Sequence, residues 1–407
     1  MTEQISAQRV SRAWWGTVVI FLVHGLIVAT WVSRIPAVQS ALKLNNGVLG
    51  LTLLSSATGA VCTIPFAGYL VSRYGSKRVT SISSALFAAA LVLPGIAFDA
   101  ATLAVALFVF GAAAASMDVG MNAQGVEVEK HLGARTMSRF HAMFSLGGMV
   151  GAGIGGWVAA RGATPAVHFG LSSVVYLAII ALTFPLLLTS HTETAHNEHR
   201  LPLNKIPRVL LALSAIGFCI LLSEGAMADW TAVYLRQILK AGPGIAAAGY
   251  AVFSAAMAIF RFLGDLITTR LGPLLTVRTG SLVAASGLLW ALCMHSPAWA
   301  LPGFAATGAG FSVIIPLVFG SGGRVESVSP GAGIATVTGI GYIGFIVGPP
   351  AIGFASQLFT LRYALGVVVA CCMISALLAR FMASERSQSF RDNRLRAPVA
   401  NESGPYR

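Results

Sequence analysis

The amino-acid sequence predicts an all-α integral membrane protein with twelve transmembrane helices in two similar six-helix halves. Three observations support this prediction: the composition, a series of twelve long apolar segments, and a repeat of residues at a constant offset. Of the 407 residues, 56% are hydrophobic and only 10% are charged, against roughly 25% charged in soluble globular proteins. The mean hydropathy is +0.77. Apolar residues therefore outnumber those that one interior could hide, and most of the surface must face lipid.

Twelve segments are long enough to cross the hydrocarbon core of a bilayer, which takes roughly 20 apolar residues in a helix. Helices are favoured over barrel strands because the segments are continuously apolar, whereas such strands alternate over about ten residues. The first segment follows Arg9 and Arg12 without a small-residue cleavage signature, so we expect a retained helix rather than a signal peptide. The connectors at Asp99 and Ser296 are short enough to predict tight helical hairpins. The predicted spans cover residues 13–33, 47–71, 79–98, 101–125, 139–160, 166–189, 208–235, 244–268, 276–295, 297–321, 331–357 and 361–383.

The basic residues predict the orientation of the chain. The net charge is +13, but the lysines and arginines lie in short connectors between apolar segments, so we expect no nucleic-acid partner. With the N-terminus inside, twenty of the 27 Lys and Arg residues fall on the cytoplasmic side and six on the outside. Basic loops are retained in the cytoplasm. We therefore expect both termini to be cytoplasmic and the protein to lie in the inner membrane. We also expect a monomer.

A polar segment divides the chain into two parts. Residues 190–207 form a predicted cytoplasmic linker between an N-terminal half (1–189) and a C-terminal half (208–383), and their three histidines are more typical of a solvated connector than of a metal-binding tract. Residues 384–407 are polar and basic, and we expect a tail that is disordered or rests on anionic lipid. The cysteines lack metal-ligand spacing, so we expect buried small hydrophobes and neither disulfides, a metal site nor a cofactor. They are Cys62, Cys219, Cys293, Cys371 and Cys372.

A repeat with an offset of 197 residues relates the two halves. Each copy of an Arg-x-Gly pattern lies in the connector after the second span of its half, which is hard to explain by chance. Two homologous six-helix halves are the simplest explanation. The matching pairs are Lys43 and Lys240, Gly47 and Gly244, Arg73 and Arg270, Gly75 and Gly272, and the fifth-span glycines 147, 151 and 156 with 344, 348 and 353.

These residues resemble the major facilitator superfamily across the whole chain. The run GYLVSRYGSKR, from Gly68 to Arg78, is similar to the loop 2–3 signature G-x-L-a-D-r-x-G-r-k, with Ser72 in place of the aspartate that usually makes a helix-locking charge contact. The fifth-span glycines resemble a motif of antiporters, with Ala152 where proline is usual. The resemblance implies the twelve-helix fold of this superfamily and a gating role for Arg73 and its repeat partner Arg270.

Several shorter runs resemble the YbjJ-type branch of the superfamily, which is distantly similar to fucose permeases. An overall likeness to membrane proteins of rhizopine (methylated inosamine) gene clusters adds amino-polyols to the expected substrates. The runs are WVSRIP from Trp31, DVGMNAQ from Asp118, SRFH from Ser138, EGAMADW from Glu224 and GY from Gly341.

Polar side chains inside the spans are candidate substrate ligands, because lipid tolerates them only where they face a cavity or a partner. His24 shares a helix face with Trp31, and we expect both in a cavity wall; the alternative for His24 is a bond to a neighbouring helix. Glu224 and Asp229 are five residues apart, so a continuous helix cannot direct both at one ligand. Trp230 is expected to stack on a sugar-like ring or, alternatively, to lie in an interfacial belt.

A second group of residues is predicted to serve proton coupling or gating. Asp118 and Asn122 share a face of the fourth span, and Glu127 follows nearer to the cytoplasm. We expect Asn122 to bind substrate and the two carboxyl groups to serve coupling or gating, with a structural hydrogen bond as the alternative for Asp118. Arg261 and Asp265 are four residues apart, so we expect an intrahelical ion pair at the cytoplasmic end, with gating as the other interpretation.

Transport is the function that these features favour. No span contains a nucleophile with a base or an H-E-x-x-H metal pair, so no enzyme is expected. The absence of a Walker motif favours an ion gradient as the energy source, with protons as the expected ion. We expect a secondary active transporter that moves a sugar, polyol or amino-polyol such as an inosamine by alternating access. The alternatives are an exporter of hydrophobic drugs or lipids and a non-transporting receptor or scaffold.

Overall fold

The computed structural model describes residues 6–134, 136–189, 206–326 and 328–383, which are almost entirely helical. Twelve helical segments of the described residues are long and apolar enough to cross a membrane. The prediction of an all-α membrane protein with twelve transmembrane helices is thus confirmed. The predicted tail and most of the predicted linker lie outside the described residues.

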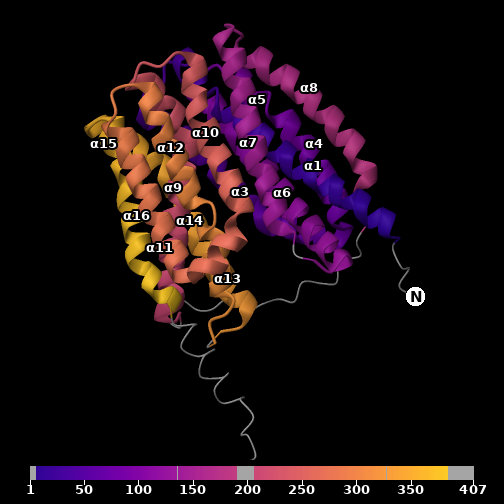
Figure 1. The fold of residues 1–407 in the computed structure, drawn as a ribbon. Helices are drawn as coiled ribbons and strands as arrows, with labels where there is room; N and C mark the ends of the chain where they lie inside the picture. The colour runs from indigo at the N-terminus through magenta and orange to yellow at the C-terminus, as the bar shows by residue number, and fades with distance from the viewer. Residues whose placement is uncertain (1–5, 135, 190–205, 327, 384–407) are drawn as a thin grey trace, which may run out of the picture.

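The two halves lie side by side, the first coloured indigo to magenta and the second salmon to yellow in Figure 1. The first half consists of α1 (Ala7–Val32), α2 (Ile35–Ala41), α3 (Asn46–Tyr74), α4 (Ser76–Ala90), α5 (Leu93–Ile96), α6 (Ala100–Leu132), α7 (Met137–Ala160), α8 (Pro165–Thr183) and the short 3₁₀ helix η1 (Phe184–Leu186). The second half consists of α9 (Arg208–Gln237), α10 (Pro243–Phe262), α11 (Gly264–Cys293), α12 (Pro297–Phe311), α13 (Ile314–Gly322), α14 (Pro330–Leu358), α15 (Leu361–Ala364), α16 (Gly366–Leu378) and η3 (Ala379–Ala383).

The eighth predicted span, residues 244–268, is not one continuous helix. It is interrupted at Leu263, between α10 and α11, and its last residues form the start of α11. The chain then turns inside α11 at Gly272, whose φ of 76° lies in the region that glycine adopts without a steric penalty. Pro273 follows and favours the start of a new helix, because it lacks the amide hydrogen that a continuous helix needs. The ninth span therefore begins after this turn.

The sequence repeat recurs in the backbone. Gly75, between α3 and α4, has a φ of 82° and corresponds to Gly272. Lys43 and Lys240 have φ values of 53° and 55° and are the two non-glycine residues with positive φ in the described part of the chain. Both precede the second span of their half. The turns that enter and leave this span are thus built in the same way twice.

The halves pack against each other through α3 with α14 and through α7 with α10. A Cβ atom on Gly353 of α14 would lie 2.6 Å from the carbonyl oxygen of Asn46, and one on Gly156 of α7 would lie 2.9 Å from that of Gly244. These backbone contacts lie at one end of the bundle, which we call the closed end; α5 and α15 lie at the same end, in the upper part of Figure 1. The other end, where residues 189 and 206 border the undescribed linker, is the linker end.

The cysteines differ in part from the prediction. Cys219, Cys371 and Cys372 are buried as expected, but Cys62 and Cys293 lie on the exposed surface. Both exposed thiols lie on helices long and apolar enough to cross a membrane. A weakly polar thiol is compatible with lipid as well as with a protein interior, so apolar sequence context alone did not distinguish the two.

Candidate functional site

Arg261, in the last turn of α10, links helices of both halves. Its Nη2 lies 3.5 Å from Oε1 of Glu224 on α9. Its Nη1 donates a hydrogen bond of 2.8 Å to Oγ of Ser145, and its Nε donates one of 3.2 Å to the carbonyl oxygen of Ser312. Ser145 belongs to α7 of the first half, so a single guanidinium group joins a carboxylate of its own half to the other half.

This arrangement corrects the predicted pair of Arg261 with Asp265. Among the described residues Arg261 forms its ion pair with Glu224, while Asp265 lies exposed in the first turn of α11. The helix break at Leu263 separates the two residues, so the regular spacing on which an i,i+4 pair depends is lost.

Further titratable and hydroxyl groups surround the Arg261–Glu224 pair. His141 of α7 and Arg261 are close enough for their charges to interact. Tyr342 of α14 interacts electrostatically with Asp118 of the first half and with Glu224 of the second. We call these residues, together with Ser145, the central cluster. Its members are Asp118, His141, Ser145, Glu224, Arg261 and Tyr342.

Asp118 and Asn122 lie on one face of α6, as their spacing predicts. The Asn122 side-chain amide donates to Oδ1 of Asp118 at 3.1 Å and to its carbonyl oxygen at 2.8 Å. Both residues are partly exposed rather than packed in a core. Glu127, nearer the linker end, lies 3.7 Å from the ring of His131 one turn further along α6. Glu127 thus has a local partner, whereas Asp118 faces the second half.

Glu224 and Asp229 both lie on α9, which is continuous from Arg208 to Gln237. Because the helix is continuous, the two carboxyl groups point in different directions, as five-residue spacing requires. Asp229 still acts electrostatically on Tyr250 of α10, which also interacts with the Arg261–Glu224 pair. Trp230 is fully buried, and its indole nitrogen has no partner in the described structure.

His24 and Trp31 of α1 lie inside the first half. The His24 ring is 5.3 Å from those of Phe87 and Phe144, and neither ring nitrogen has a hydrogen-bond partner in the described structure. Trp31 packs between Phe110 of α6 and Phe169 of α8 and is 4% exposed. Both side chains are therefore covered by aromatic residues in this conformation.

The residues of the loop 2–3 signature lie at the linker end. Arg73 and Arg270 are exposed, and the guanidinium group of Arg73 lies 5.7 Å from the centre of the Tyr74 ring. Ser72, which replaces the aspartate of the signature, donates to the carbonyl oxygen of Tyr69 at 2.8 Å. The hydroxyl of Ser72 is thus used within its own helix.

Amide side chains connect the halves at the closed end. Nδ2 of Asn46 donates to Oε1 of Gln237 at 3.2 Å, and Nε2 of Gln237 donates to Oε1 of Gln39 and Oδ1 of Asn46, both at 3.1 Å. Gln357 of α14 donates to Oδ1 of Asn45. We call these five residues the amide cluster. All five side chains are uncharged, so hydrogen bonds rather than ion pairs hold this end together.

Sequence reasoning missed the amide cluster and the role of several other residues. His141, Gln124 and Tyr342 lie within the sequence runs that resemble the YbjJ-type branch, so those runs were a signal for them. Gln124 ties α6 to Ser76 and to the backbone of Leu188 just before the linker, at 2.9 and 2.6 Å. No pattern in a single sequence indicates that Gln39 and Gln237, which lie in different halves, share a hydrogen bond.

The central cluster can bind and release protons and hold a polar solute. Its carboxyl groups and its histidine are the residue types that relay protons inside membranes. Its tyrosine and serine hydroxyls can both donate and accept hydrogen bonds. Glu224 and Arg261 are 21% and 11% exposed at their side chains, so water or a small solute can reach the pair.

Comparisons with known proteins agree with this architecture. The family model described as Major Facilitator Superfamily matches residues 13–325. An uncharacterised MFS-type transporter of Yersinia pestis is 35% identical over 365 residues, which cover 88% of this chain and 93% of that protein. The membrane protein MosC of Rhizobium meliloti is 32% identical over 365 residues, covering 87% of this chain and 88% of that protein.

Solved structures share the same fold at low sequence identity. A bacterial homologue of the human lysosomal transporter Spinster, inward-facing and unoccupied, superposes with a TM-score of 0.74 at 13% identity, covering 95% of this chain and 99% of that one. The transporter FucP in its outward conformation superposes with a TM-score of 0.62 at 17% identity, covering 91% and 99%. The family match and the identity to full-length relatives confirm the predicted resemblance: the chain belongs to the Major Facilitator Superfamily of transporters.

Proposed function

We propose that the protein is a proton-coupled secondary transporter of a small polar solute, and that the central cluster is its substrate and coupling site. The observation that carries the proposal is the position of Arg261. It binds Glu224 in its own half and Ser145 in the other half, 3.5 and 2.8 Å away. Any change in the charge of Glu224, or any ligand that competes for Arg261, therefore acts on a contact between the halves.

The conformation supports access from one side. The closed end is shut by the amide cluster and by backbone contacts at Gly156 and Gly353. Since the Glu224–Arg261 pair is still partly exposed, we infer that solute reaches it from the linker end. With the linker and both termini in the cytoplasm, this is an inward-facing state of a monomer in the inner membrane.

The chemistry of the cluster favours a hydroxyl- or amine-bearing solute over a lipophilic one. Asp118 bonds only to the neutral amide of Asn122, so its charge is not balanced by a cation in the described ion pairs. Tyr342 and Ser145 offer hydroxyl groups from opposite halves. A hydrophobic drug would leave these groups without partners, at a cost of about 1–3 kcal/mol for each buried group.

The two carboxylates are assigned different roles. Asp118 takes up and releases the coupling proton, because it is not engaged by a cation. Glu224, held by Arg261, responds to the solute: a solute hydroxyl or amine that binds Glu224 weakens the ion pair and lets Arg261 shift relative to Ser145 of the other half. His24 and Asp229 lie behind the cluster and are assigned supporting roles in the same path.

A transport assay tests these roles. Purified protein is first screened by thermal shift against polyols, inosamines, sugars and lipophilic cations, because a ligand of the folded state raises the melting temperature. In proteoliposomes loaded with the best ligand, Asp118→Asn should retain counterflow but lose accumulation driven by a pH gradient. Asp99→Asn, which changes an exposed carboxylate at the closed end, serves as the control and should transport like the wild type.

Two results contradict the proposal. Accumulation that survives Asp118→Asn removes Asp118 from proton coupling. Stabilisation by lipophilic cations alone, with no response to polyols, sugars or inosamines, points instead to a drug or lipid exporter.

The orientation has its own test. Lys240 at the closed end and Lys130 at the linker end are both exposed. Cysteines at these positions, in a background without the five native cysteines, should react with a membrane-impermeant reagent from outside at residue 240 and only after permeabilisation at residue 130. The reverse pattern places the termini outside the cell.

A further inference from the structure

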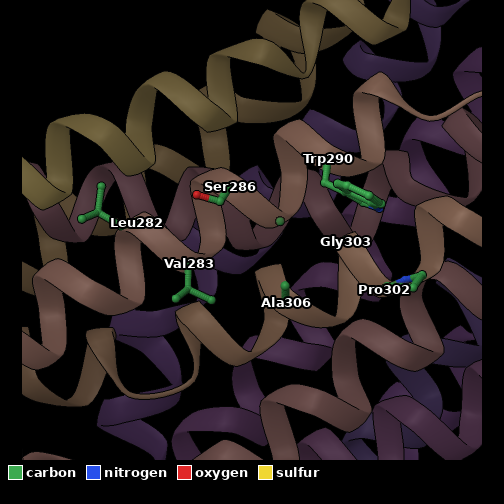
Figure 2. A pocket seen from close by; sticks show the side chains of 8 residues that line it. Leu282, Val283, Ser286, Trp290, Pro302, Gly303 and Ala306 are labelled. Atoms are coloured by element: carbon green, nitrogen blue, oxygen red, sulfur yellow. The ribbon is translucent and has the colours of Figure 1, made fainter.

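A groove of about 430 Å³ runs along the surface of the second half between α11 and α12. Figure 2 shows its lining side chains, which come from both helices. The walls are mostly apolar: apart from Trp290, only Ser286 has a polar side chain among the lining residues. The lining residues are Leu282, Val283, Ser286, Gly287, Trp290, Pro302, Gly303 and Ala306.

The groove lies beside a close contact between the backbones of the two helices. A Cβ atom on Gly287 would lie 2.7 Å from the carbonyl oxygen of Gly303 and 2.7 Å from Cβ of Ala306. The helix backbones thus touch, as small residues permit in membrane helices. Because Gly287, Gly303 and Ala306 are all small, the outer side of this contact is left hollow between the larger walls of Leu282 and Trp290.

The groove opens toward the hydrocarbon of the bilayer. Val283 and Trp290 are about half exposed, and the neighbouring Trp299 is exposed as well. No charged residue lies between Arg278 and the end of α11, or anywhere in α12. Nε1 of Trp290 donates to the carbonyl oxygen of Trp299 at 2.8 Å, which places two indoles at the closed end, where tryptophans mark the membrane interface.

Ser286 carries the observation that points to a ligand. Its side chain is exposed, and its hydroxyl has no hydrogen-bond partner among the described residues. Other hydroxyls in the spans, such as those of Thr30 and Ser223, donate to the carbonyl oxygen four residues earlier. A hydroxyl in hydrocarbon without a partner is unfavourable. Ser286 is one turn, about 6 Å, deeper than Trp290, within reach of a group that enters from the interface.

The first half does not contain the same arrangement, although it repeats the same pair of helices. At the positions equivalent in the repeat, α4 and α6 have Ala89 for Ser286, Ala90 for Gly287, Ala106 for Gly303 and Val109 for Ala306. The hydroxyl is absent there, and three of the four side chains are larger. The fold therefore does not require the groove.

We propose that this groove binds one acyl chain of a membrane phospholipid, with the Ser286 hydroxyl donating a hydrogen bond to the ester carbonyl of that chain. The length fits: from Trp290 to Leu282 the groove extends along α11 by about 12 Å, most of the roughly 15 Å depth of one leaflet. A groove between two helices fits a single acyl chain better than it fits another helix, which would need a broad, flat surface. The lipid belongs to the leaflet at the closed end.

Native mass spectrometry of the full-length protein tests this inference. Protein purified in detergent is stripped of lipid and mixed with 1-palmitoyl-2-oleoyl-phosphatidylethanolamine. The wild type should retain one lipid per chain. The double variant Ser286→Leu/Ala306→Leu fills the groove and should retain at least tenfold less, whereas Ala89→Leu, at the equivalent lipid-facing position of the first half, should bind like the wild type.

The smaller change Ser286→Ala keeps the space and removes only the hydroxyl, so it should weaken lipid retention several-fold. If the double variant does not fold, Ser286→Ala still tests the proposal. The melting temperature of each variant shows whether it is folded. Equal retention by wild type and by a folded groove-filling variant overturns the proposal. Retention of detergent without lipid would also overturn it. So would a dimer that forms in the wild type but not in the variant, because a second copy of the chain would then occupy the groove.

Discussion

The two halves of the molecule share their backbone features and differ in their charged side chains. Turns at Gly75 and Gly272 and at Lys43 and Lys240, which are equivalent in the repeat, have nearly the same φ angles. Helix contacts repeat as well: Gly111 packs on the backbone of Ser56, and their equivalents Gly308 and Phe253 make the same contact. The residues that shape the backbone are thus repeated.

The charged residues of the central cluster are not repeated. Glu224 corresponds to Ile27, and Arg261 corresponds to Ile64; Asp118, in turn, corresponds to Ile315. Each half therefore contributes charges that the other lacks, and the cluster exists only where the halves meet. This difference separates the residues that specify the fold from those that we assign to transport.

The largest expected effect comes from the unrepeated cation. Arg261→Met should lower the rate of counterflow in proteoliposomes at least a hundredfold, because Glu224 is left without its partner and the link to Ser145 is lost. Ile64→Met, the same residue at the equivalent position of the first half, should leave transport unchanged. If both variants transport equally well, the asymmetry of charge between the halves has no role in transport.

Adding Glu224→Gln to Arg261→Met separates stability from transport. Removing one member of a partly buried ion pair destabilises more than removing both. Glu224→Gln/Arg261→Met should therefore melt at a higher temperature than Arg261→Met alone, without recovering transport. A double variant that regains transport would show that the pair is only structural.

The second expected effect concerns the repeated glycines. A Cβ atom at Gly111 or Gly308 would overlap the facing carbonyl oxygen, so Gly111→Ala and Gly308→Ala should each destabilise by about 1–3 kcal/mol. The controls are Gly153→Ala and Gly339→Ala, where a Cβ meets nothing within 4 Å. Melting temperatures in detergent should fall together for the first two variants and stay level for the controls. A fall in one half only would show that the repeat has diverged in packing.

The third effect concerns the closed end of the molecule. Gln237→Ala removes the hydrogen bonds of Gln237 to Gln39 and Asn46, worth roughly 0.5–1.5 kcal/mol each. A cysteine at Ala228, labelled from the closed-end side, should then react roughly tenfold faster. Ser40→Ala, an exposed hydroxyl on α2, is the control. Unchanged labelling in Gln237→Ala would mean that the glycine contacts alone hold this end shut.

The amide cluster also predicts how labelling responds to pH. None of its members titrates, so labelling of the wild type should be constant between pH 5 and pH 8. In Gln237→Glu, the carboxylate opposes the side-chain oxygens of Gln39 and Asn46, and labelling should accelerate above the ordinary glutamate pKa of about 4.3. A pH-dependent wild type would show that another, titratable group controls this end.

The fold was predictable because it depends on signals that lie within one sequence. Continuous apolar segments define the spans, and the constant offset of the repeat links Gly75 with Gly272 from the sequence alone. The break at Leu263 was not predicted, because residues 244–268 form one largely apolar segment in the sequence, although Gly264 follows the break directly. The wrong pairing of Arg261 with Asp265 follows from that break.

The charged members of the candidate site could be selected from the sequence, but its uncharged members and its contacts could not. Asp118, Glu224 and Arg261 were selected because charges inside spans need partners; the structure pairs Glu224 with Arg261, and Tyr342 interacts with both Glu224 and Asp118. The identity of the partner depends on how helices from different halves pack, as for Arg261 with Ser145, and spacing along one helix cannot supply it. Uncharged residues such as Gln39 carry no such signal, since amides are common in connectors.

The smallest expected effect compares the hairpins at Asp99 and Ser296, which occupy equivalent positions in the repeat. Asp99 caps α6: its carboxylate accepts hydrogen bonds from the amide and hydroxyl of Thr102 at 2.8 and 2.7 Å, and these bonds lower its pKa. Ser296 caps α12 without a side-chain bond. Asp99→Ala should lower the melting temperature at pH 7 by roughly 2 °C, and Ser296→Ala should not change it.

Because the pKa of Asp99 is lower in the folded protein, its contribution is present above the ordinary aspartate pKa of about 3.9 and is lost as the pH falls through the folded value. The difference in melting temperature between wild type and Asp99→Ala should therefore shrink on acidification below pH 4; a difference that stays constant there would show that the cap acts without its charge.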